Sequence, residues 1–313
     1  MLMKIFRSPS RRRGFTLIEL LIAMAITTII ATVMISVTAI AIDSWNRSRA
    51  ELRAARQAKF MVDVLTKDFE SLVTRRGNKF EWLSAKTAKV LPGSNRQTSA
   101  NASKLIFFTT ATDRYEGKIN TPDDKGGDVS CVAYDLQYKD PIDGGNTDFA
   151  TFTLNRLLIN PDKAFEDLLG QTELETAFEA YSTQMVALKN FVCENIYQYS
   201  ITFHVEVTKD AGTDKATKLN VPISLGPTAG SGRVTEFSIL GSGIALSESP
   251  NPNVTVDELK AGRVSAVEVS LTVISDFGMQ QLRSKASLMG DAMTKFMAKN
   301  SFQYSKLVEL PCL

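Results

Sequence analysis

Residues 11–26 of the 313-residue chain read RRRGFTLIELLIAMAI, and this stretch decides how the rest of the chain is organised. A basic leader ends at Gly14, and residues 15–42 then form an apolar run that contains a single acidic residue, Glu19. The run is longer than the ~20 residues that cross a bilayer as a helix. A carboxylate inside such a segment costs several kcal/mol unless it is paired. The sequence therefore predicts a membrane helix in which Glu19 has a functional partner.

The natural partner of Glu19 is a cation that cleavage after Gly14 would create. The new α-amino group of Phe15 would lie four residues from Glu19 and could pair with the Glu19 of a neighbouring copy. This arrangement resembles the type IV prepilin signature. The resemblance implies cleavage by a prepilin peptidase between Gly14 and Phe15, N-methylation of Phe15, and a role in assembly for Glu19. An ordinary signal peptide has only about 7 to 15 apolar residues, and neither it nor a plain signal anchor accounts for Glu19.

The distribution of charge along the chain predicts its orientation in the membrane and does not indicate a ligand. The formal net charge is +2, but five basic residues lie in the leader: Lys4, Arg7, Arg11, Arg12 and Arg13. Without the leader the chain is mildly acidic, so its composition does not favour nucleic-acid binding. Basic residues that flank an apolar span stay in the cytoplasm. We therefore expect a single-pass protein of the bacterial inner membrane, with a cytoplasmic N-terminus and a periplasmic head.

The segment after the apolar run predicts a helical stalk. Residues 15–76 contain no Gly or Pro, which is consistent with one continuous helix. Beyond Asp43, apolar and charged residues alternate at spacings of three and four, which predicts an amphipathic helix packed on a sheet. Residues 75–78 read RRGN and predict its end. The expected organisation is a cleaved leader at 1–14, a membrane or filament-core helix at 15–42, a stalk at 43–77 and a head at 78–313.

The head combines strand and helix patterns. Residues 132–139, 201–207 and 267–273 alternate between apolar and polar side chains and are separated from other runs by Gly, Pro and Asn turns. These patterns predict an antiparallel meander laid over the stalk, which is an α+β, pilin-like fold. Residues 86–103 are expected to form a loop-rich linker, and residues 161–188 a helix. Another helix is expected at 277–299, with a Met-rich stripe that is interpreted as core in preference to a partner surface.

Local patterns in the head extend the resemblance. Residues 105–109, 132–136, 154–156, 192–196 and 264–269 are similar, in this order, to the large J-type pseudopilins of the type II secretion system. The anchor and the large head also resemble the prepilin-like cassette proteins of the Verru-Chthon C type. The resemblance implies a structural subunit, not an enzyme, that joins other pseudopilins through its apolar helix in a short periplasmic filament. The alternative is a minor pilin of a type IV pilus or DNA-uptake system. The expected partners are the prepilin peptidase, other pseudopilins and the inner membrane, with no nucleic acid or small-molecule substrate.

The head sequence offers no complete catalytic set. His204 is the only histidine, and alternation places it on the polar face of its strand. Residues 226–233 are rich in glycine but lack the Gly-Lys-Ser/Thr ending of a phosphate-binding loop, so a hairpin loop is the better interpretation. Arg156 is in phase with apolar neighbours and is expected to pair with a carboxylate across the sheet.

The sequence also offers a candidate disulfide and a candidate calcium site. The cysteines are Cys131, Cys193 and Cys312; one disulfide is possible in an oxidising compartment, with Cys131 and Cys193 the first choice. No cofactor is expected, although structural calcium is possible. The candidate oxygen ligands lie in two acidic turns, one with Asp140, Asp143, Asn146 and Asp148 and the other with Asp123, Asp124 and Asp128. Neither turn fits the EF-hand register, and solvated turns are the favoured interpretation.

Overall fold

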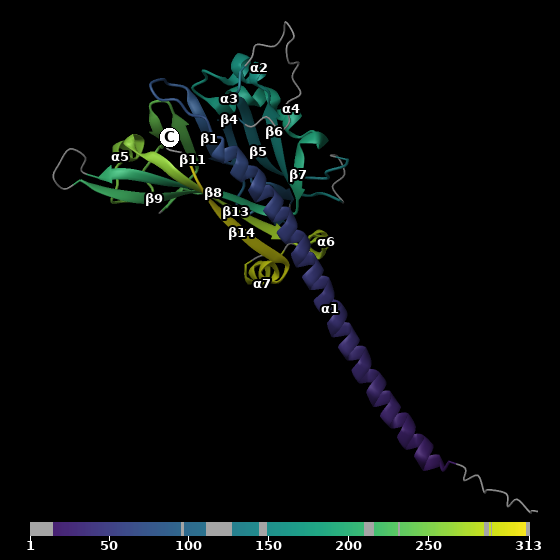
Figure 1. The fold of residues 1–313 in the computed structure, drawn as a ribbon. Helices are drawn as coiled ribbons and strands as arrows, with labels where there is room; N and C mark the ends of the chain where they lie inside the picture. Colours follow the sequence, from purple (N-terminus) through teal and green to yellow (C-terminus); the bar gives the residue numbers. More distant parts are fainter. Residues whose placement is uncertain are drawn as a thin grey trace, which may run out of the picture. The chain divides into compact units, whose positions relative to one another are not determined.

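The structure is a computed structural model that describes residues 15–94, 97–110, 127–143, 149–209, 216–230, 232–284, 288 and 290–310. The chain divides into two compact units, Met1–Arg49 and Ala50–Leu313. The helix α1 (Leu17–Glu70) begins in the first unit and ends in the second. Figure 1 draws the helices and strands of both units as a ribbon coloured along the sequence.

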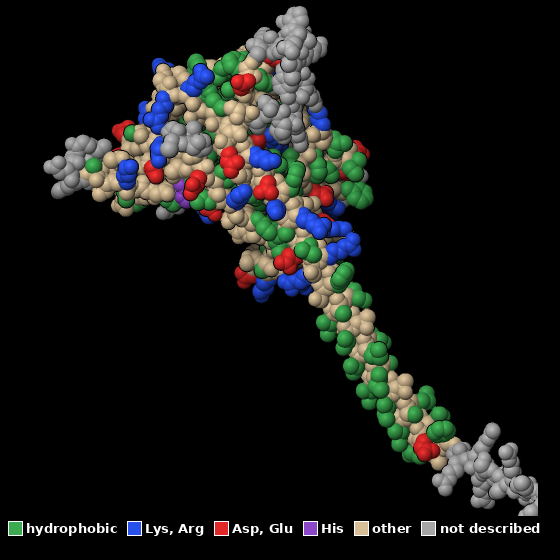
Figure 2. Space-filling view, viewed as in Figure 1, with side chains coloured by type: hydrophobic (Ala, Val, Ile, Leu, Met, Phe, Trp, Pro, Cys, Tyr) green, Lys and Arg blue, Asp and Glu red, His purple; other side chains and the backbone are tan. Residues whose placement is uncertain are grey.

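The described part of the first unit is the apolar portion of α1. Every residue from 15 to 49 is exposed, and Figure 2 shows hydrophobic side chains along this portion of the helix. Its hydroxyl side chains donate to the backbone carbonyl four residues earlier, as in Thr27 to Ala23 at 2.8 Å and Ser36 to Thr32 at 2.9 Å. These bonds satisfy the hydroxyl donors within the helix, which suits a segment that faces an apolar environment.

The head unit is built on two large sheets and one small one (Figure 1). The seven-stranded sheet has the order β12 (Gly243–Ala245), β11 (Glu236–Leu240), β1 (Glu81–Thr87), β4 (Ser103–Thr109), β5 (Ser130–Lys139), β6 (Thr151–Ile159) and β7 (Phe191–Glu194). The five-stranded sheet has the order β10 (Arg233–Val234), β9 (Thr217–Leu225), β8 (Ile196–Lys209), β13 (Arg263–Ile274) and β14 (Ser301–Glu309). A small hairpin pairs β2 (Gly93–Ser94) with β3 (Gln97–Thr98).

The pairing of these strands confirms the α+β fold class. Neighbouring strands run antiparallel, except that β10 lies parallel to β9. The alternating runs at 132–139, 201–207 and 267–273 are the central strands β5, β8 and β13. The chain is thus a long N-terminal apolar helix whose later part packs against antiparallel sheets, which is a pilin-like architecture.

Two hydrophobic cores lie on opposite faces of the seven-stranded sheet. The larger core joins this sheet, the five-stranded sheet and the buried side of α1, including Ala58, Leu65 and Phe69. The smaller core lies beneath the segment 161–190. The side chains of β5 alternate between the two faces of the sheet, so that Tyr134 lies in the larger core and Cys131 in the smaller one. The amphipathic half of α1 therefore packs on a sheet, as its periodicity predicts.

Residues 161–190 do not form the single helix that their sequence predicts. They form a series of short pieces: α2 (Pro161–Lys163), the π-helix η1 (Ala164–Leu168), α3 (Leu174–Phe178), the 3₁₀-helix η2 (Glu179–Tyr181), α4 (Ser182–Met185) and the 3₁₀-helix η3 (Leu188–Asn190). Gly170 interrupts them with a φ of 95°, a conformation that an α-helix does not contain. The apolar residues recur at helical spacing because they form the buried side of this irregular layer. We call residues 161–190 the cover segment.

Other boundaries also differ from the sequence prediction. The helix α1 ends at Glu70 instead of continuing to residue 76, because the next residues pair with the end of β4: the Val73 N–H donates to the Phe108 carbonyl at 2.9 Å. The expected linker at 86–103 overlaps the end of β1 and contains β2 and β3. The expected C-terminal helix is two helices, α6 (Asp276–Ser284) and α7 (Asp291–Asn300), and β14 follows them. A short α5 (Val256–Ala261) precedes β13.

Candidate functional site

The start of α1 places the candidate assembly residue in a capping box. Thr16 is the N-cap residue, and its hydroxyl oxygen accepts the Glu19 N–H at 3.3 Å. In return, the Glu19 carboxylate accepts the Thr16 N–H and the Thr16 hydroxyl, both at 2.9 Å. This reciprocal pattern satisfies donors that a helix start leaves unpaired. The carboxylate thus has hydrogen-bond donors within its own chain, which the sequence analysis missed although Thr-x-x-Glu is a known capping pattern.

The residues around this cap are accessible where the structure describes them. The side chain of Phe15 is 88% exposed, and Leu17 is 81% exposed. Gly14 lies outside the described residues, so the cleavage and methylation roles assigned to Gly14 and Phe15 stay predictions. The geometry permits the Glu19 carboxylate to exchange a local donor for an external one, because nothing among the described residues buries it.

A second carboxylate of α1, Asp68, forms a buried ion pair in the head. Its oxygens accept from Arg156 in a bidentate arrangement, with Nε at 2.7 Å and Nη2 at 2.8 Å. The Tyr134 hydroxyl also donates to Asp68, and both charged side chains are at least 97% buried. Burial, together with the neighbouring Asp68 charge, raises the pKa of Tyr134 well above its ordinary value. The predicted partner across the sheet is therefore wrong: the carboxylate comes from the helix, and the sheet contributes the phenol.

The two described cysteines do not form the predicted disulfide. Cys131 and Cys193 are both free and buried. Cys131 belongs to the smaller core and Cys193 to the larger one, so their side chains lie on opposite faces of the seven-stranded sheet. Burial raises the pKa of the Cys193 thiol to about 12. This pairing failed because the face of each cysteine depends on strand register, which spacing along the sequence does not fix.

The acidic turns show no metal centre in the part of the chain that the structure describes. No three His, Cys, Asp or Glu side chains come together there as a metal site. Asp140 is buried, and its carboxylate accepts the N–H groups of Ile142 at 2.8 Å and Asp143 at 3.3 Å, which is the usual role of Asp in a turn. Asp148, Asn146, Asp123 and Asp124 lie outside the described residues, as does Cys312.

Neither His204 nor the glycine-rich loop has the geometry of a catalytic or phosphate-binding site. His204 lies on β8 with its Nε2 3.9 Å from a Glu268 carboxylate oxygen, which is beyond hydrogen-bond distance. The glycine-rich loop at 226–233 leads into the strand β10, not into a helix, so it lacks the helix N-terminus of a phosphate site. The loop joins parallel strands, which corrects the hairpin interpretation.

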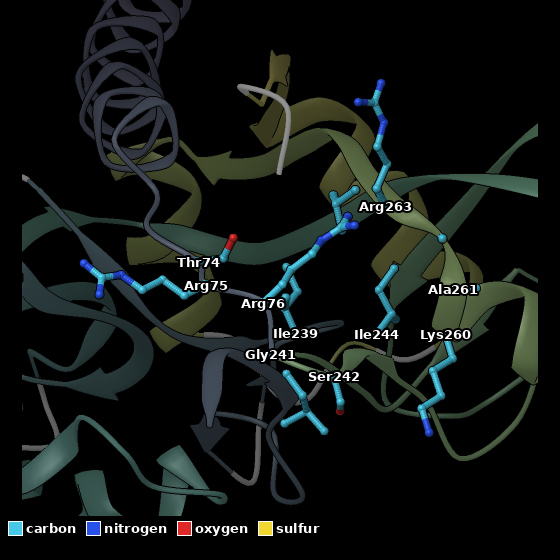
Figure 3. A pocket seen from close by; sticks show the side chains of 14 residues that line it. Thr74, Arg75, Arg76, Ile239, Gly241, Ser242, Ile244, Lys260, Ala261 and Arg263 are labelled. Carbon is cyan, nitrogen blue, oxygen red and sulfur yellow. The ribbon is translucent and has the colours of Figure 1, made fainter. Parts of the chain in front are cut away.

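One basic cavity lies near the end of α1. It has a volume of about 200 Å³ and is lined by Arg75, Arg76, Lys260 and Arg263 among other residues. Figure 3 shows the side chains of Arg75, Lys260 and Arg263 pointing away from one another, not toward a common centre. The Arg263 guanidinium also binds the Glu206 carboxylate at 3.0 Å. Arg75, Lys260 and Arg263 therefore do not converge on one ligand.

Comparison with known proteins identifies the N-terminal segment. Residues 9–42 match the family model described as the prokaryotic N-terminal methylation motif. No curated protein and no solved structure matches the chain. Among the described helices, α1 alone is long and apolar enough to cross a membrane. The chain is therefore type IV pilin-like in its methylation motif and its architecture, and the motif with this helix indicates single-pass anchoring in a membrane.

Proposed function

We propose that this protein is a minor pseudopilin, a structural subunit that assembles into a short periplasmic filament of a type II secretion-like machine. The observation that carries the proposal is the lone carboxylate of Glu19 at the start of an exposed apolar helix, inside the segment that matches the methylation motif. The local patterns of the head that resemble J-type pseudopilins support the particular machine. Structural pilin-like proteins have no reaction to catalyse, and the protein acts through assembly.

The assembly step follows from the energetics of the apolar helix. A lipid bilayer and a helix bundle are similarly apolar, so transfer of the segment 15–42 between them costs little hydrophobic free energy. The pairing of the Glu19 carboxylate therefore decides the free-energy difference between the subunit in the bilayer and the subunit in the filament. In the bilayer, Glu19 relies on the neutral donors of Thr16; in the filament, the α-amino group of a neighbour's Phe15 would supply a charge-assisted bond.

The proposal assigns a role to each part of the chain. The leader 1–14 is removed by the prepilin peptidase after Gly14, and the new N-terminal Phe15 is methylated. The segment 15–42 anchors the subunit in the inner membrane and forms the filament core with other pseudopilins. The segment 43–77 connects this anchor to the periplasmic head at 78–313. Cleavage therefore precedes assembly, because it creates the amine that Glu19 requires.

Processing is tested by mass spectrometry of the membrane-extracted protein. We expect Phe15 as the N-terminus with a methyl group, and a retained leader in Gly14→Ala. Glu19→Ala should keep normal processing and insertion but co-purify poorly with other pseudopilins. Normal co-purification of Glu19→Ala would refute the assembly role, and an N-terminus beyond Ala23 would indicate a conventional signal peptide.

The machine is tested by cross-linking and deletion. Cysteines placed at Ile30 and Val33 should yield products with other pseudopilins, and deletion should block export of folded proteins while DNA uptake and surface attachment continue. Abundant ladders of this chain alone would indicate a major filament subunit. Lost DNA uptake with normal secretion would indicate the alternative, a minor pilin.

A further inference from the structure

The portion of α1 that follows the apolar run carries a tryptophan and two arginines. Residues 15–46 contain no Lys or Arg, so Arg47 and Arg49 are the first basic side chains after the leader. Trp45 is 70% exposed, and both arginines are exposed as well. These residues all belong to the first compact unit. We call residues 43–49 the collar, because they encircle the helix just beyond its apolar run.

The collar lies at the level of the lipid headgroups when the apolar run spans a bilayer. A helix rises 1.5 Å per residue, so Trp45, Arg47 and Arg49 lie roughly 5–10 Å beyond Ile42 along the axis. The headgroup region extends roughly 5–8 Å beyond each side of the hydrocarbon core. Helical side chains point back toward the N-terminus, which here is toward the bilayer, so long arginine side chains reach the headgroups. Residues 17–42 alone measure roughly 39 Å against a core of about 30 Å, and tilt brings the collar closer still.

Neither topology nor the fold of the head accounts for these arginines. Basic residues that set orientation stay in the cytoplasm, and the leader already supplies them, whereas the collar is expected on the periplasmic side. Within the described residues neither Arg47 nor Arg49 forms an ion pair, whereas Arg53, one turn further on, binds the Asp276 carboxylate at 2.9 Å. Asp43 is the one acid of the collar and lies one turn before Arg47, so two cations face a single carboxylate there. The collar therefore keeps an excess of basic charge.

We propose that the collar binds the headgroups of anionic phospholipids in the bilayer that α1 spans. The guanidinium groups donate charge-assisted hydrogen bonds to phosphate oxygens, and each planar group can donate two at once. A zwitterionic headgroup already carries its own cation, so an anionic headgroup gains more from the arginines. Because Arg47 and Arg49 lie on opposite sides of the helix, they suit a ligand that surrounds it, as lipids do. Trp45 lies at the boundary, where an indole ring contacts acyl chains and its N–H contacts the polar region.

The test follows the emission of Trp45 in the full chain reconstituted in nanodiscs of phosphatidylcholine and phosphatidylglycerol. Trp82 is the only other tryptophan and is buried, so a Trp45→Phe variant supplies its emission as the background. Bromine on the acyl chains quenches nearby tryptophan, and equal amounts are carried either by the anionic lipid or by the neutral one. We expect quenching of Trp45 to be about twofold or more stronger when the anionic lipid carries the bromine.

Charge variants of the collar should move this preference in both directions. Arg47→Gln/Arg49→Gln should abolish it, and Asp43→Asn should strengthen it. Lys218→Gln/Lys260→Gln removes the same charge from two exposed positions outside the collar and should keep the wild-type preference. Equal quenching by both lipids in the wild type, or a preference that the two double variants keep or lose alike, would overturn the proposal. The proposal rests on the membrane anchor alone, and the nanodiscs contain no pseudopilin, so the result is independent of the filament role.

Discussion

Glu19 and Asp68 are carboxylates of the same helix, but their hydrogen-bond donors come from different distances along the chain. The donors to Glu19 come from Thr16, three residues away, and the site is exposed. The donors to Asp68 come from Tyr134 and Arg156, which are 66 and 88 residues away in the buried core. A local partner is present whenever the helix start is formed, whereas the distant partners are present only when the head is folded.

This difference separates two tasks within one helix. Because Glu19 depends on its own turn, it can change partner without any change in the head. Asp68 instead fixes α1 against β5 and β6, because its geometry is bidentate and a shift along the helix would leave two buried charges apart. The exposed half of α1 is suited to exchange partners, and the buried half is suited to hold the head in one position on the helix.

The largest expected effect comes from breaking the buried pair. Arg156→Met should destabilise the head by about 3–5 kcal/mol, because it leaves the Asp68 charge buried without its cation. The double variant Asp68→Leu/Arg156→Met should recover most of this loss, since it removes both charges and keeps apolar volume. Urea unfolding of the full chain in detergent measures both. A double variant as unstable as the single one would show that the loss of stability does not come from the unpaired Asp68 charge.

The two halves of α1 should also respond differently to loss of apolar volume. Leu65 is fully buried in the larger core, so Leu65→Ala should cost about 2–5 kcal/mol of head stability. Leu21 is 61% exposed, and Leu21→Ala should change head stability by less than about 0.5 kcal/mol. The same unfolding measurement checks both variants. Similar losses from the two substitutions would contradict the division of the helix into an exposed and a packed half.

The sequence predicts features that depend on neighbouring residues. The apolar run, the lone Glu19 and the alternation of β5, β8 and β13 are all local patterns, and the structure contains the helix and these strands. The strand β1 was missed, because its first five residues are buried and both faces of the sheet carry a core, so it shows no alternation of apolar and polar side chains.

Features that depend on register or on distant contacts were not predictable. The sequence shows that Arg156 lies on the same side of its strand as apolar residues. No local pattern, however, indicates that its partner is Asp68 in the helix. The cysteines were assigned a possible bond although they occupy opposite sheet faces, and the cover segment imitates a helix because its apolar side chains recur at helical spacing. The short pairing of β7 with β6 depends on where β7 stops, which only the folded chain defines.

A smaller effect is expected at the capping box. Thr16→Val removes the hydroxyl that binds Glu19 and should destabilise the first turn of α1 by about 1 kcal/mol. Thr28→Val is the matched control, because the Thr28 hydroxyl donates only to the helix carbonyl of Met24. Hydrogen exchange of the Glu19 amide should quicken in the first variant and stay unchanged in the second. Equal exchange rates in both would show that Thr16 does not cap the helix.

The smallest expected effect is a pH-dependent one at Asp135, on β5 in the head. Burial raises the pKa of the Asp135 carboxyl, while the Gln137 amide and nearby Lys104 and Lys139 act in the opposite direction. Because the folded pKa lies above the unfolded value of about 3.9, this group stabilises the fold fully below that value and loses its contribution as pH rises through the folded pKa. Asp135→Asn should therefore be slightly more stable than the wild type at pH 7, and this advantage should disappear near pH 3.5. Thermal unfolding at the two pH values measures the difference, with the exposed Glu248→Gln as control. An equal advantage at both pH values would mean that the charge of Asp135 is not the cause.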